Sequence, residues 1–319
     1  MKEDVMSCSA ANGLNIGIVG AGKMGAPIAR RLADGGYNVT ICDIDPTATE
    51  LLKRAGFRAL SSARDLATSC EVILGCVSGP GSYWSVTGGP DGILHGDRVH
   101  TYINVGTTGP ELAAKIEGTL AEREIQTLDA PVTGGPRRAQ RGELAAMVSG
   151  PSALAESLKP ILESYASKIV YVGDAVGQAQ YLKVANNLIT AGNLVIALEA
   201  LTLASKVGIS PGVFLEVINA GSAASDVTLV KLPNHVLTRT FDFGASLALV
   251  DHDVSACLAA AETAGVEMAV GQAIQAIYRE AIASSGPLAD LTIVAKLLEE
   301  RVGAGFRNEE SPGGWDGVP

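Results

Sequence analysis

The sequence has few of the residues that mark several large classes of protein. Only 4% of its 319 residues are aromatic, its five cysteines include no Cys-x-x-Cys pair, and its basic residues form no run. The 24 basic residues are outnumbered by 34 acidic ones, which gives a net charge of −10. Because nucleic-acid binding needs clustered Lys and Arg, we expect no nucleic-acid partner.

The cysteines, histidines and apolar runs of the sequence also indicate whether to expect a metal site, a membrane span or a particular compartment. The odd cysteine number predicts free thiols, and the four histidines lack the spacing of metal ligands, so we expect no metal. Residues 1–13 resemble neither a signal peptide nor a transit peptide. Asn193 and Glu199 interrupt the apolar stretch 188–204, so we expect no membrane span. These features favour a cytoplasmic protein.

What the chain does contain suits helices packed on a parallel sheet. Hydrophobic residues make up 47% of it, and there are 37 glycines, enough for frequent turns. Residues 14–19 form a short apolar run before a glycine turn, a helix follows, and Gly35-Gly36 ends it before a second run at 39–42. This is a βαβ pattern with two parallel strands. Further strands are predicted at 71–77, 99–105, 125–128, 144–148 and 169–172.

After Gly177 the pattern becomes helical. Residues 178–207 contain no proline and one glycine, and apolar residues surround the whole circumference, which predicts a long buried helix. Segments 211–220, 246–264 and 266–283 also read as helices. We predict an α/β fold with an N-terminal Rossmann-type doubly wound sheet, joined by this long helix to an all-α C-terminal domain. The expected parts are a flexible extension (1–13), a dinucleotide-binding domain (14–176), a helical substrate and dimerisation domain (177–305) and a loose tail (306–319).

The strongest motif is Gly20-x-Gly22-x-x-Gly25 between the first strand and its helix. The first glycine permits the tight turn, the second lets a pyrophosphate approach, and the third lets helix and strand pack closely. Free N–H groups at the helix start would bind the phosphates. A turn without a ligand is the alternative, but the strand–turn–helix context favours a dinucleotide site. The candidate cofactor residues in this turn are Gly20, Gly22, Lys23, Met24 and Gly25.

Asp43, at the end of the second strand, indicates which dinucleotide binds. A carboxylate there accepts hydrogen bonds from the ribose 2′-hydroxyl and repels a 2′-phosphate. No Arg or Lys lies between Thr40 and Leu52, so we predict NAD rather than NADP. Asp45 competes for this role, but before Pro46 it is better explained as a helix cap.

Two more groups of polar residues are candidates for substrate binding. Thr133, Gly134 and Gly135 can offer a hydroxyl and backbone N–H groups to a carboxylate, although a plain strand-to-loop transition explains them equally well. Lys183 and Asn187 lie four residues apart and so on one helix face. A lysine that reaches to solvent is the simpler explanation of Lys183 alone. Its position near the helix start, partial burial and Asn187 favour a role in proton transfer.

Together these motifs resemble those of the β-hydroxyacid dehydrogenases, a family that includes 3-hydroxyisobutyrate dehydrogenase, tartronate semialdehyde reductase and L-threonate dehydrogenase. The resemblance runs from about residue 14 to residue 298. Three stretches carry it in the family's order: GIVGAGKMGAPIARRL, DAPVTGGPRRAQRGELAAMVSG and GQAQYLKVANNLI.

The resemblance implies hydride transfer between nicotinamide and a small 3-hydroxy acid similar to 3-hydroxyisobutyrate. It makes Lys183 the general acid/base and Asn187 a residue that orients substrate. It assigns the substrate carboxylate to Thr133, Gly134 and Gly135, and a cofactor contact to Thr107. It also implies a homodimer or homotetramer, without a metal.

The chain departs from the family in four places. Thr133 stands where relatives usually have Ser, Ala179 where they often have Gly, and residues 104–107 read Asn-Val-Gly-Thr instead of Asp-x-Ser-Thr. Relatives carry a Lys-Asp pair where this chain has His252-Asp253, and that lysine reaches the cofactor. Because histidine titrates near neutrality, we hypothesise an unusual substrate or a pH-dependent step at His252.

Two alternatives remain for the function. Imine reductases have a similar two-domain layout, but relatives with that activity lack the catalytic lysine. Non-catalytic dinucleotide-binding relatives also replace this lysine. Lys183 therefore opposes both alternatives, and fold alone does not decide between them.

Overall fold

The computed structural model describes residues 13–303 and 305–306. The chain divides into two compact units, and the division falls between Val184 and Ala185. The expected extension and tail lie outside the described residues, apart from Gly13 and Phe306. The predicted domain limits at 176 and 177 stay a prediction.

The first unit is built on one sheet, whose strands follow the order β3-β2-β1-β4-β5-β6-β8-β7, with β9 paired to β8. The strands are β1 (Asn15–Val19), β2 (Asn38–Cys42), β3 (Arg58–Ala59), β4 (Val72–Gly75), β5 (Thr101–Asn104), β6 (Gln126–Asp129), β7 (Val132–Thr133), β8 (Leu144–Ser149) and β9 (Ala166–Gly173). The order from β3 to β6 is that of a Rossmann sheet. Successive strands are added on one side of β1 up to β3 and then on its other side from β4 to β6, while all of them stay parallel.

The strand pairing confirms the predicted βαβ unit. Strand β1 is parallel to β2, with Ile16 opposite Val39, and it is also parallel to β4 on its other side. Strand β8 differs, because it runs antiparallel to β6 and β7 and parallel to β9. An apolar run predicts a strand but carries no information about its direction, so this reversal was not predicted. The two-residue strands β3 and β7 are too short to show a pattern.

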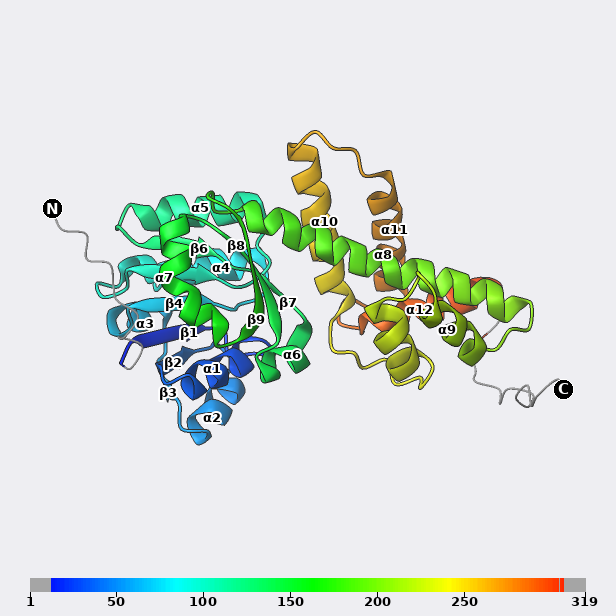
Figure 1. Ribbon diagram of the computed structural model, residues 1–319, viewed down its shortest axis with the longest axis horizontal. Helices are drawn as coiled ribbons and strands as arrows, with labels where there is room; N and C mark the ends of the chain where they lie inside the picture. Colours follow the sequence, from blue (N-terminus) through cyan, green and yellow to red (C-terminus); the bar gives the residue numbers. More distant parts are fainter. Residues whose placement is uncertain (1–12, 304, 307–319) are drawn as a thin grey trace. The chain divides into compact units, whose positions relative to one another are not determined.

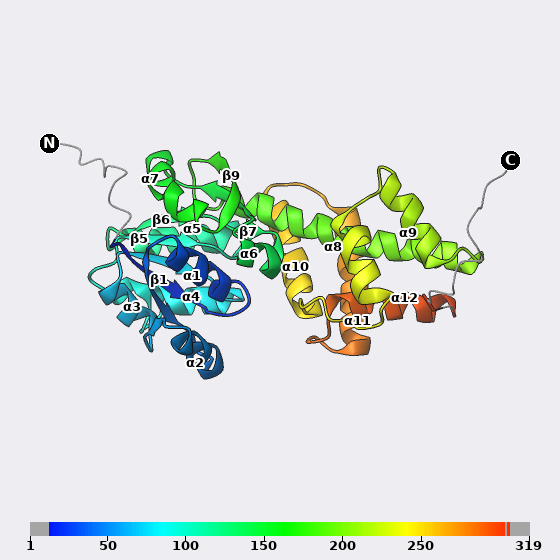
Figure 2. The same ribbon diagram turned by 60° about the horizontal axis from the view of Figure 1, so that its bottom comes forward.

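Helices cover both faces of the sheet (Figures 1 and 2). They are α1 (Gly25–Asp34), α2 (Pro46–Arg54), α3 (Ala63–Ser69), α4 (Pro80–Gly88), α5 (Pro110–Ala121), α6 (Gly135–Arg141) and α7 (Ser152–Glu163), with a 3-10 turn, η1 (Ile93–His95). Ile16 and Ile18 of β1 share a buried cluster with Ile28 of α1 and Leu158 of α7. Side chains on the other face of the sheet form a second cluster with α3, α4 and α5. The sheet is therefore doubly wound, as predicted.

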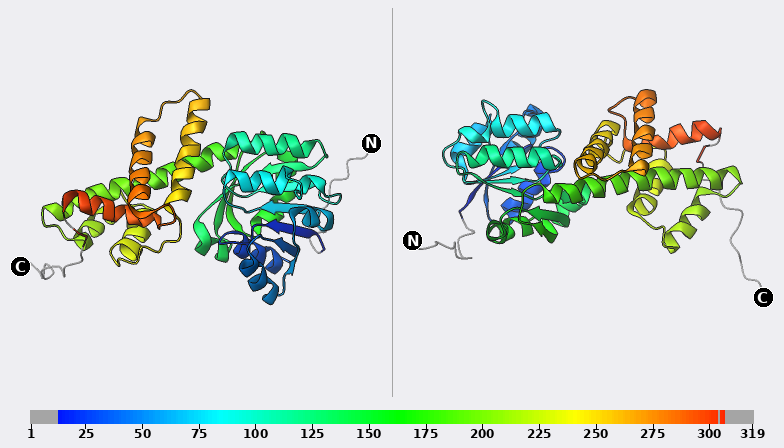
Figure 3. Two further views of the ribbon diagram at one scale, coloured as in Figure 1. Left: turned by 180° about the vertical axis from the view of Figure 1, so that it is seen from behind. Right: turned by 90° about the horizontal axis from the view of Figure 1, so that it is seen from above.

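The second unit is helical, which confirms the predicted all-α domain. It contains most of α8 (Gln178–Lys206), then α9 (Pro211–Ala220), the π-helix η2 (Val227–Val236), α10 (Leu247–Thr263), α11 (Ala269–Ser285), the 3-10 turn η3 (Leu291–Ile293) and α12 (Val294–Val302). Helices α10 and α11 lie side by side (Figure 3). The sequence patterns do not mark η2, because Pro233 lies inside it.

Helix α8 is not buried all round, which corrects the sequence prediction. Leu194, Leu198 and Leu201 are buried, whereas four apolar side chains spaced seven residues apart are exposed. They are Leu182 (47% exposed), Ile189 (63%), Ile196 (63%) and Leu203 (69%). By length and composition alone, α8 could also cross a membrane. Its buried leucines give its apolar character another explanation, as the core helix of the second unit.

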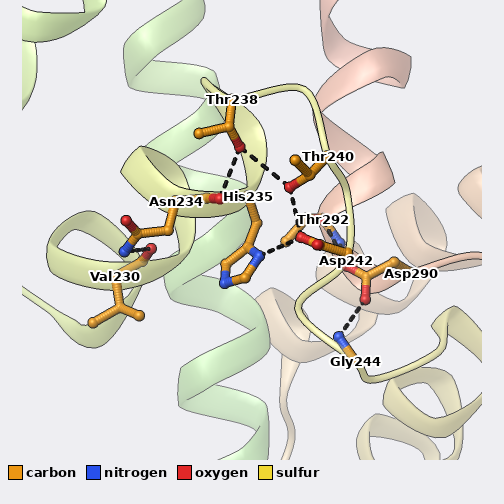
Figure 4. A network of polar contacts seen from close by, with 9 residues as sticks. All are labelled: Val230, Asn234, His235, Thr238, Thr240, Asp242, Gly244, Asp290 and Thr292. Carbon is orange, nitrogen blue, oxygen red and sulfur yellow. Dashed lines mark hydrogen bonds and ion pairs between the residues drawn. The ribbon is translucent and has the colours of Figure 1, made fainter.

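A polar network holds the loop between η2 and α10 (Figure 4). Asp242 Oδ1 lies 2.7 Å from His235 Nδ1 and accepts a hydrogen bond from Thr240 Oγ1 at 2.5 Å. These contacts, with the Thr240 hydroxyl contributing most, lower the pKa of Asp242. Asp290 Oδ2 accepts from the Gly244 backbone N–H at 2.6 Å. The network fixes the chain just before α10, the helix that carries His252 and Asp253.

Candidate functional site

The glycine turn after β1 has the geometry that a dinucleotide pyrophosphate needs. Gly20 has φ +90°, and a Cβ there would lie 2.6 Å from the Cys76 carbonyl oxygen. A Cβ on Gly25, at the start of α1, would lie 1.8 Å from the Gly20 carbonyl oxygen. A Cβ on Gly22 would meet no atom within 4 Å, so the turn leaves open space at its middle glycine. The three glycines therefore fit the turn, approach and packing roles of a dinucleotide site.

Lys23 and Met24 complete this turn. Met24 is the N-cap residue of α1 and makes no side-chain capping bond. Its half-buried side chain packs against the main cluster of the first unit, while Lys23 is exposed. The helix start therefore offers backbone N–H groups to an anion without a competing side-chain cap.

Asp43 is tied directly to the glycine turn. Its Oδ2 accepts a hydrogen bond from the Ala21 backbone N–H at 2.5 Å, and its Oδ1 accepts from Asp45 N–H at 2.8 Å. Asp45 caps α2 by accepting from Thr47 N–H at 2.8 Å, which confirms its predicted capping role. The neighbouring Ile44 is 99% exposed, an apolar side chain beside the expected ribose position that the motifs do not single out.

Thr107 lies in the segment that connects β5 to α5, and one side chain of α8 holds this segment. Gln180 Oε1 accepts from the backbone N–H groups of Thr108, at 2.9 Å, and Gly109, at 3.1 Å. Its Nε2 donates to the Gly106 carbonyl oxygen at 3.1 Å. Thr107 itself is half-buried, between residues whose backbone is fixed on both sides. The sequence motifs do not point to Gln180.

The same glutamine reaches a buried carboxyl group. Asp129 Oδ1 accepts from Gln180 Nε2 at 2.7 Å and from Asn104 Nδ2 at 2.9 Å. Asp129 is fully buried, and this burial raises the pKa of its carboxyl group from 3.8 to about 7, against the opposing effect of both donors. The family-like stretch DAPVTGGPRRAQRGELAAMVSG thus begins with an acid that is held by the first turn of α8.

The candidate carboxylate loop follows Asp129 in the chain. Thr133 ends β7, opposite Ala145 of β8, and is half-buried. Gly134 has φ +125° and Gly135 has φ +73°, conformations that favour glycine. A Cβ on Gly135 would meet nothing within 4 Å. The backbone at Gly135 therefore borders open space and directly follows Thr133 and Gly134, an arrangement that suits a small anion.

Lys183 lies one helical turn after Gln180 on α8 and is only 9% exposed. Ser149, at the end of β8, anchors the beginning of the same helix by accepting from Ala179 N–H at 2.9 Å. The lysine is thus carried by a turn that hydrogen bonds attach to two strand ends, through Ser149 and Asp129. Burial of a lysine at such a fixed position suits a group that transfers a proton.

Asn187 lies in the second unit, where an acid orients it. Its Nδ2 donates to Asp253 Oδ2 of α10 at 2.7 Å, and its Oδ1 accepts from Asn186 Nδ2 at 3.1 Å. His252 precedes this acid, and its Nε2 is buried without a hydrogen-bond partner among the described residues. The Asn187–Asp253 bond was not predicted, because 66 residues separate the two side chains.

The described residues offer little support for metal or thiol chemistry. They contain no group of three His, Cys, Asp or Glu side chains that could hold a metal ion. Cys42, Cys70, Cys76 and Cys257 are free thiols, as predicted, while Cys8 lies outside the described residues. Burial raises the pKa of both Cys42 and Cys70 to about 11, which makes them poor nucleophiles.

Two family models cover most of the chain. Residues 15–173 match a model described as the NAD binding domain of 6-phosphogluconate dehydrogenase. Residues 177–298 match a model described as the NAD-binding of NADP-dependent 3-hydroxyisobutyrate dehydrogenase.

Named relatives agree with these models. The chain is 28% identical to 2-(hydroxymethyl)glutarate dehydrogenase of Eubacterium barkeri, over 91% of this chain and 96% of that one. It is 31% identical to L-threonate dehydrogenase of Cupriavidus necator, over 70% and 75% of the two chains. The solved 3-hydroxyisobutyrate dehydrogenase of Mycobacterium tuberculosis with L-serine is 25% identical, with a TM-score of 0.77 over 89% and 99% of the two chains.

The matched models span both units, and the named relatives are dehydrogenases of hydroxy acids. Their matches coincide with the glycine turn of the first unit and with the helices of the second. The chain belongs to the β-hydroxyacid dehydrogenase family and is an NAD(P)-dependent oxidoreductase that acts on the CH–OH group of a hydroxy acid.

Proposed function

We propose that this enzyme oxidises, reversibly, a small 3-hydroxy acid similar to 3-hydroxyisobutyrate, with NAD as the hydride acceptor. The observation that carries the proposal is Lys183, a lysine only 9% exposed on a helix turn that buried hydrogen bonds hold in place. Such a lysine suits proton exchange with the substrate hydroxyl.

The cofactor is held by the turn from Gly20 to Gly25, including Lys23 and Met24, and by Asp43. When bound, NAD⁺ accepts a hydride from the carbinol carbon of the substrate. Asp43, already bonded to the turn, is available to the ribose hydroxyls and repels a 2′-phosphate. Thr107 contacts the cofactor, and His252 takes the place of the family's cofactor lysine. NAD is therefore the preferred dinucleotide.

The substrate carboxylate binds Thr133, Gly134 and Gly135. The left-handed glycines and the open space at Gly135 support this assignment. The names of the relatives point to hydroxymethylglutarate, threonate and serine, which share a carboxylate and a hydroxyl group. The methyl group of Thr133 narrows the loop relative to the usual serine and favours small acids.

The proton is handled by Lys183. Its Nζ accepts the hydroxyl proton during oxidation and returns a proton to the carbonyl oxygen during reduction. Asn187 orients the substrate, and Asp253 orients Asn187 through the 2.7 Å bond. Both non-dehydrogenase alternatives leave a buried Lys183 without a function.

The enzyme assembles as a homodimer or homotetramer in the cytoplasm. The four apolar side chains exposed along α8 support the assembly, because their seven-residue spacing places them on one side of the helix, where a second copy could bury them. The odd cysteine number and the free thiols favour a reducing compartment.

The test is NADH formation over a panel of hydroxy acids: 3-hydroxyisobutyrate, glycerate, threonate, serine and bulkier aryl analogues. We expect turnover with NAD⁺ that Lys183→Ala lowers by about 1000-fold, the scale of general acid–base catalysis, while the matched surface variant Lys168→Ala keeps wild-type turnover. Binding of NADH without turnover of any acid would contradict the proposed substrate class. Full activity of Lys183→Ala would contradict the proposed role of the lysine.

A further inference from the structure

Gln180 uses every hydrogen-bonding position of its amide. The side chain is fully buried, its Oε1 accepts two backbone N–H groups, and its Nε2 donates to the Gly106 carbonyl oxygen and to Asp129. An amide has two acceptor positions and two donor hydrogens, so this set leaves none over. A side chain of another length or chemistry would leave buried groups unpaired.

These bonds join two segments that the proposed mechanism needs to keep in register. One is the segment 106–109, which carries Thr107 between β5 and α5. The other is the first turns of α8, where Lys183 follows Gln180 by three residues and so lies on a neighbouring part of the same helix face. Gln180 thus directly links the segment 106–109, which carries Thr107, to the helix that carries the proposed acid/base.

The link continues into the sheet. Asp129 accepts from both Gln180 and Asn104, and Asn104 Nδ2 also donates to Thr108 Oγ1 at 3.0 Å. The ends of β5 and β6 and the segment 106–109 therefore share one network with α8. The bonds close a ring of buried contacts, so that a movement of α8 would displace the segment with it.

We propose that Gln180 is a positioning residue that fixes the Thr107 segment relative to Lys183, so that hydride transfer from the carbon and proton transfer from the oxygen occur at one substrate C–OH group. The inference rests on the proposed function for its catalytic consequence. The clamp itself is testable without turnover. Displacements of about 1 Å in such sites lower rates by about 100-fold, which sets the expected scale.

The experiment compares Gln180→Met with Gln178→Met. Methionine matches glutamine in length but makes none of these bonds. Gln178 lies in the same first turn of α8 and is exposed, and among the described residues its side chain accepts a hydrogen bond only from the nearby Ala175 N–H. Three quantities are measured: hydrogen exchange of a peptide covering residues 106–109 without cofactor, the Kd for NADH, and kcat with NAD⁺ and 3-hydroxyisobutyrate or the fastest acid of the panel.

For Gln180→Met we expect faster exchange at residues 106–109, a 10- to 100-fold lower kcat and a change in Kd for NADH of less than about threefold, since the glycine turn and Asp43 are untouched. Gln178→Met keeps wild-type values for all three. A loss of stability alone would lower the amount of folded enzyme without lowering kcat per folded site. Faster exchange with unchanged kcat, or an equal fall in Gln178→Met, would overturn the inference.

A second variant decides the matter if Gln180→Met does not fold. Gln180→Glu keeps the shape and the acceptor for the Thr108 and Gly109 N–H groups, but a carboxylate cannot donate to the Gly106 carbonyl oxygen. For Gln180→Glu we expect the protection of residues 106–109 and kcat to fall together below the wild-type values, and to lie above those of Gln180→Met where that variant folds. A large fall in kcat with fully retained protection would refute positioning. Activity of Lys183→Ala, measured in parallel, reports separately on the proposed function.

Discussion

Asp129 gives the most quantitative prediction, because burial raises its pKa from 3.8 to about 7. In the unfolded chain this carboxyl group releases its proton near pH 3.8, whereas in the folded protein it keeps the proton until about pH 7. Between these values the folded state binds more protons than the unfolded state. The free energy of unfolding therefore falls as pH rises through this window.

The size of this effect follows from the pKa difference. A shift of about 3 units corresponds to about 4 kcal/mol in total, at 1.36 kcal/mol per unit. Added acid brings the net charge of −10 toward zero, which lowers the solubility of the protein. Measurements are therefore made between about pH 5.5 and about pH 8. Over that narrower range the linkage relation leaves about 2 kcal/mol.

Asp129→Asn isolates this contribution. The asparagine oxygen still accepts from Gln180 and Asn104, but the group no longer titrates. Its new NH₂ cannot accept from the backbone N–H groups of Gly177 and Gln180, which also lower the pKa of the Asp129 carboxyl group, and this costs about 1–3 kcal/mol at every pH. The stability of Asp129→Asn relative to the wild type should therefore rise by about 2 kcal/mol across the window.

Urea unfolding followed by circular dichroism measures this difference at each pH. Asp65→Asn is the control, because hydroxyl donors from Ser62 and Ser61 lower the pKa of this exposed carboxylate and leave it ionised throughout the window. Its stability difference from the wild type should stay constant. A constant difference for Asp129→Asn as well would show that Asp129 is ionised in the folded protein and would refute the reasoning.

Three further predictions concern the cofactor, His252 and assembly. Gly22→Ala should leave urea stability unchanged and raise the Kd for NADH at least 10-fold, because its Cβ meets only the open space of the turn; equal binding would place the pyrophosphate elsewhere. His252→Lys should change the pH profile of kcat or the preferred acid of the panel, and no change would remove histidine from the step. Ile196→Glu, on the exposed side of α8, should yield monomers by light scattering; an intact oligomer would place the interface elsewhere.

The parts of the fold that the sequence predicts are those encoded by local pattern. The run 14–19, the three glycines and Asp43 lie within 30 residues, and each has a local reason for its identity. Their predicted arrangement reappears in the parallel pair β1–β2 and in the 2.5 Å bond from Ala21 to Asp43. The long helix is predicted for the same reason, since residues 178–207 lack proline, contain one glycine and carry apolar residues around the whole helical circumference.

The direction of β8 and the exposed side of α8 escape such reasoning. Apolar residues show that a segment needs a partner surface, but not which one. Along α8, Leu198 and Leu203 look equivalent in the sequence, yet one is buried in the chain and the other is 69% exposed. Hydrophobicity therefore predicts which side chains are stabilised by burial. Only the folded structure shows which of them are buried within one copy of the chain.

Hydrogen bonds between residues far apart in the sequence also escape prediction from local pattern. Lys183 and Asn187 stand out in the sequence because polar groups in an apolar helix need an explanation. Gln180 and Asp253 do not stand out, although most buried polar groups in proteins have a hydrogen-bond partner. Their partners are 51 and 66 residues away, Asp129 and Asn187, and are selected by the fold rather than by spacing. The residues proposed to carry the chemistry can thus be read from local pattern, while the residues that orient them become visible only when distant segments are brought together.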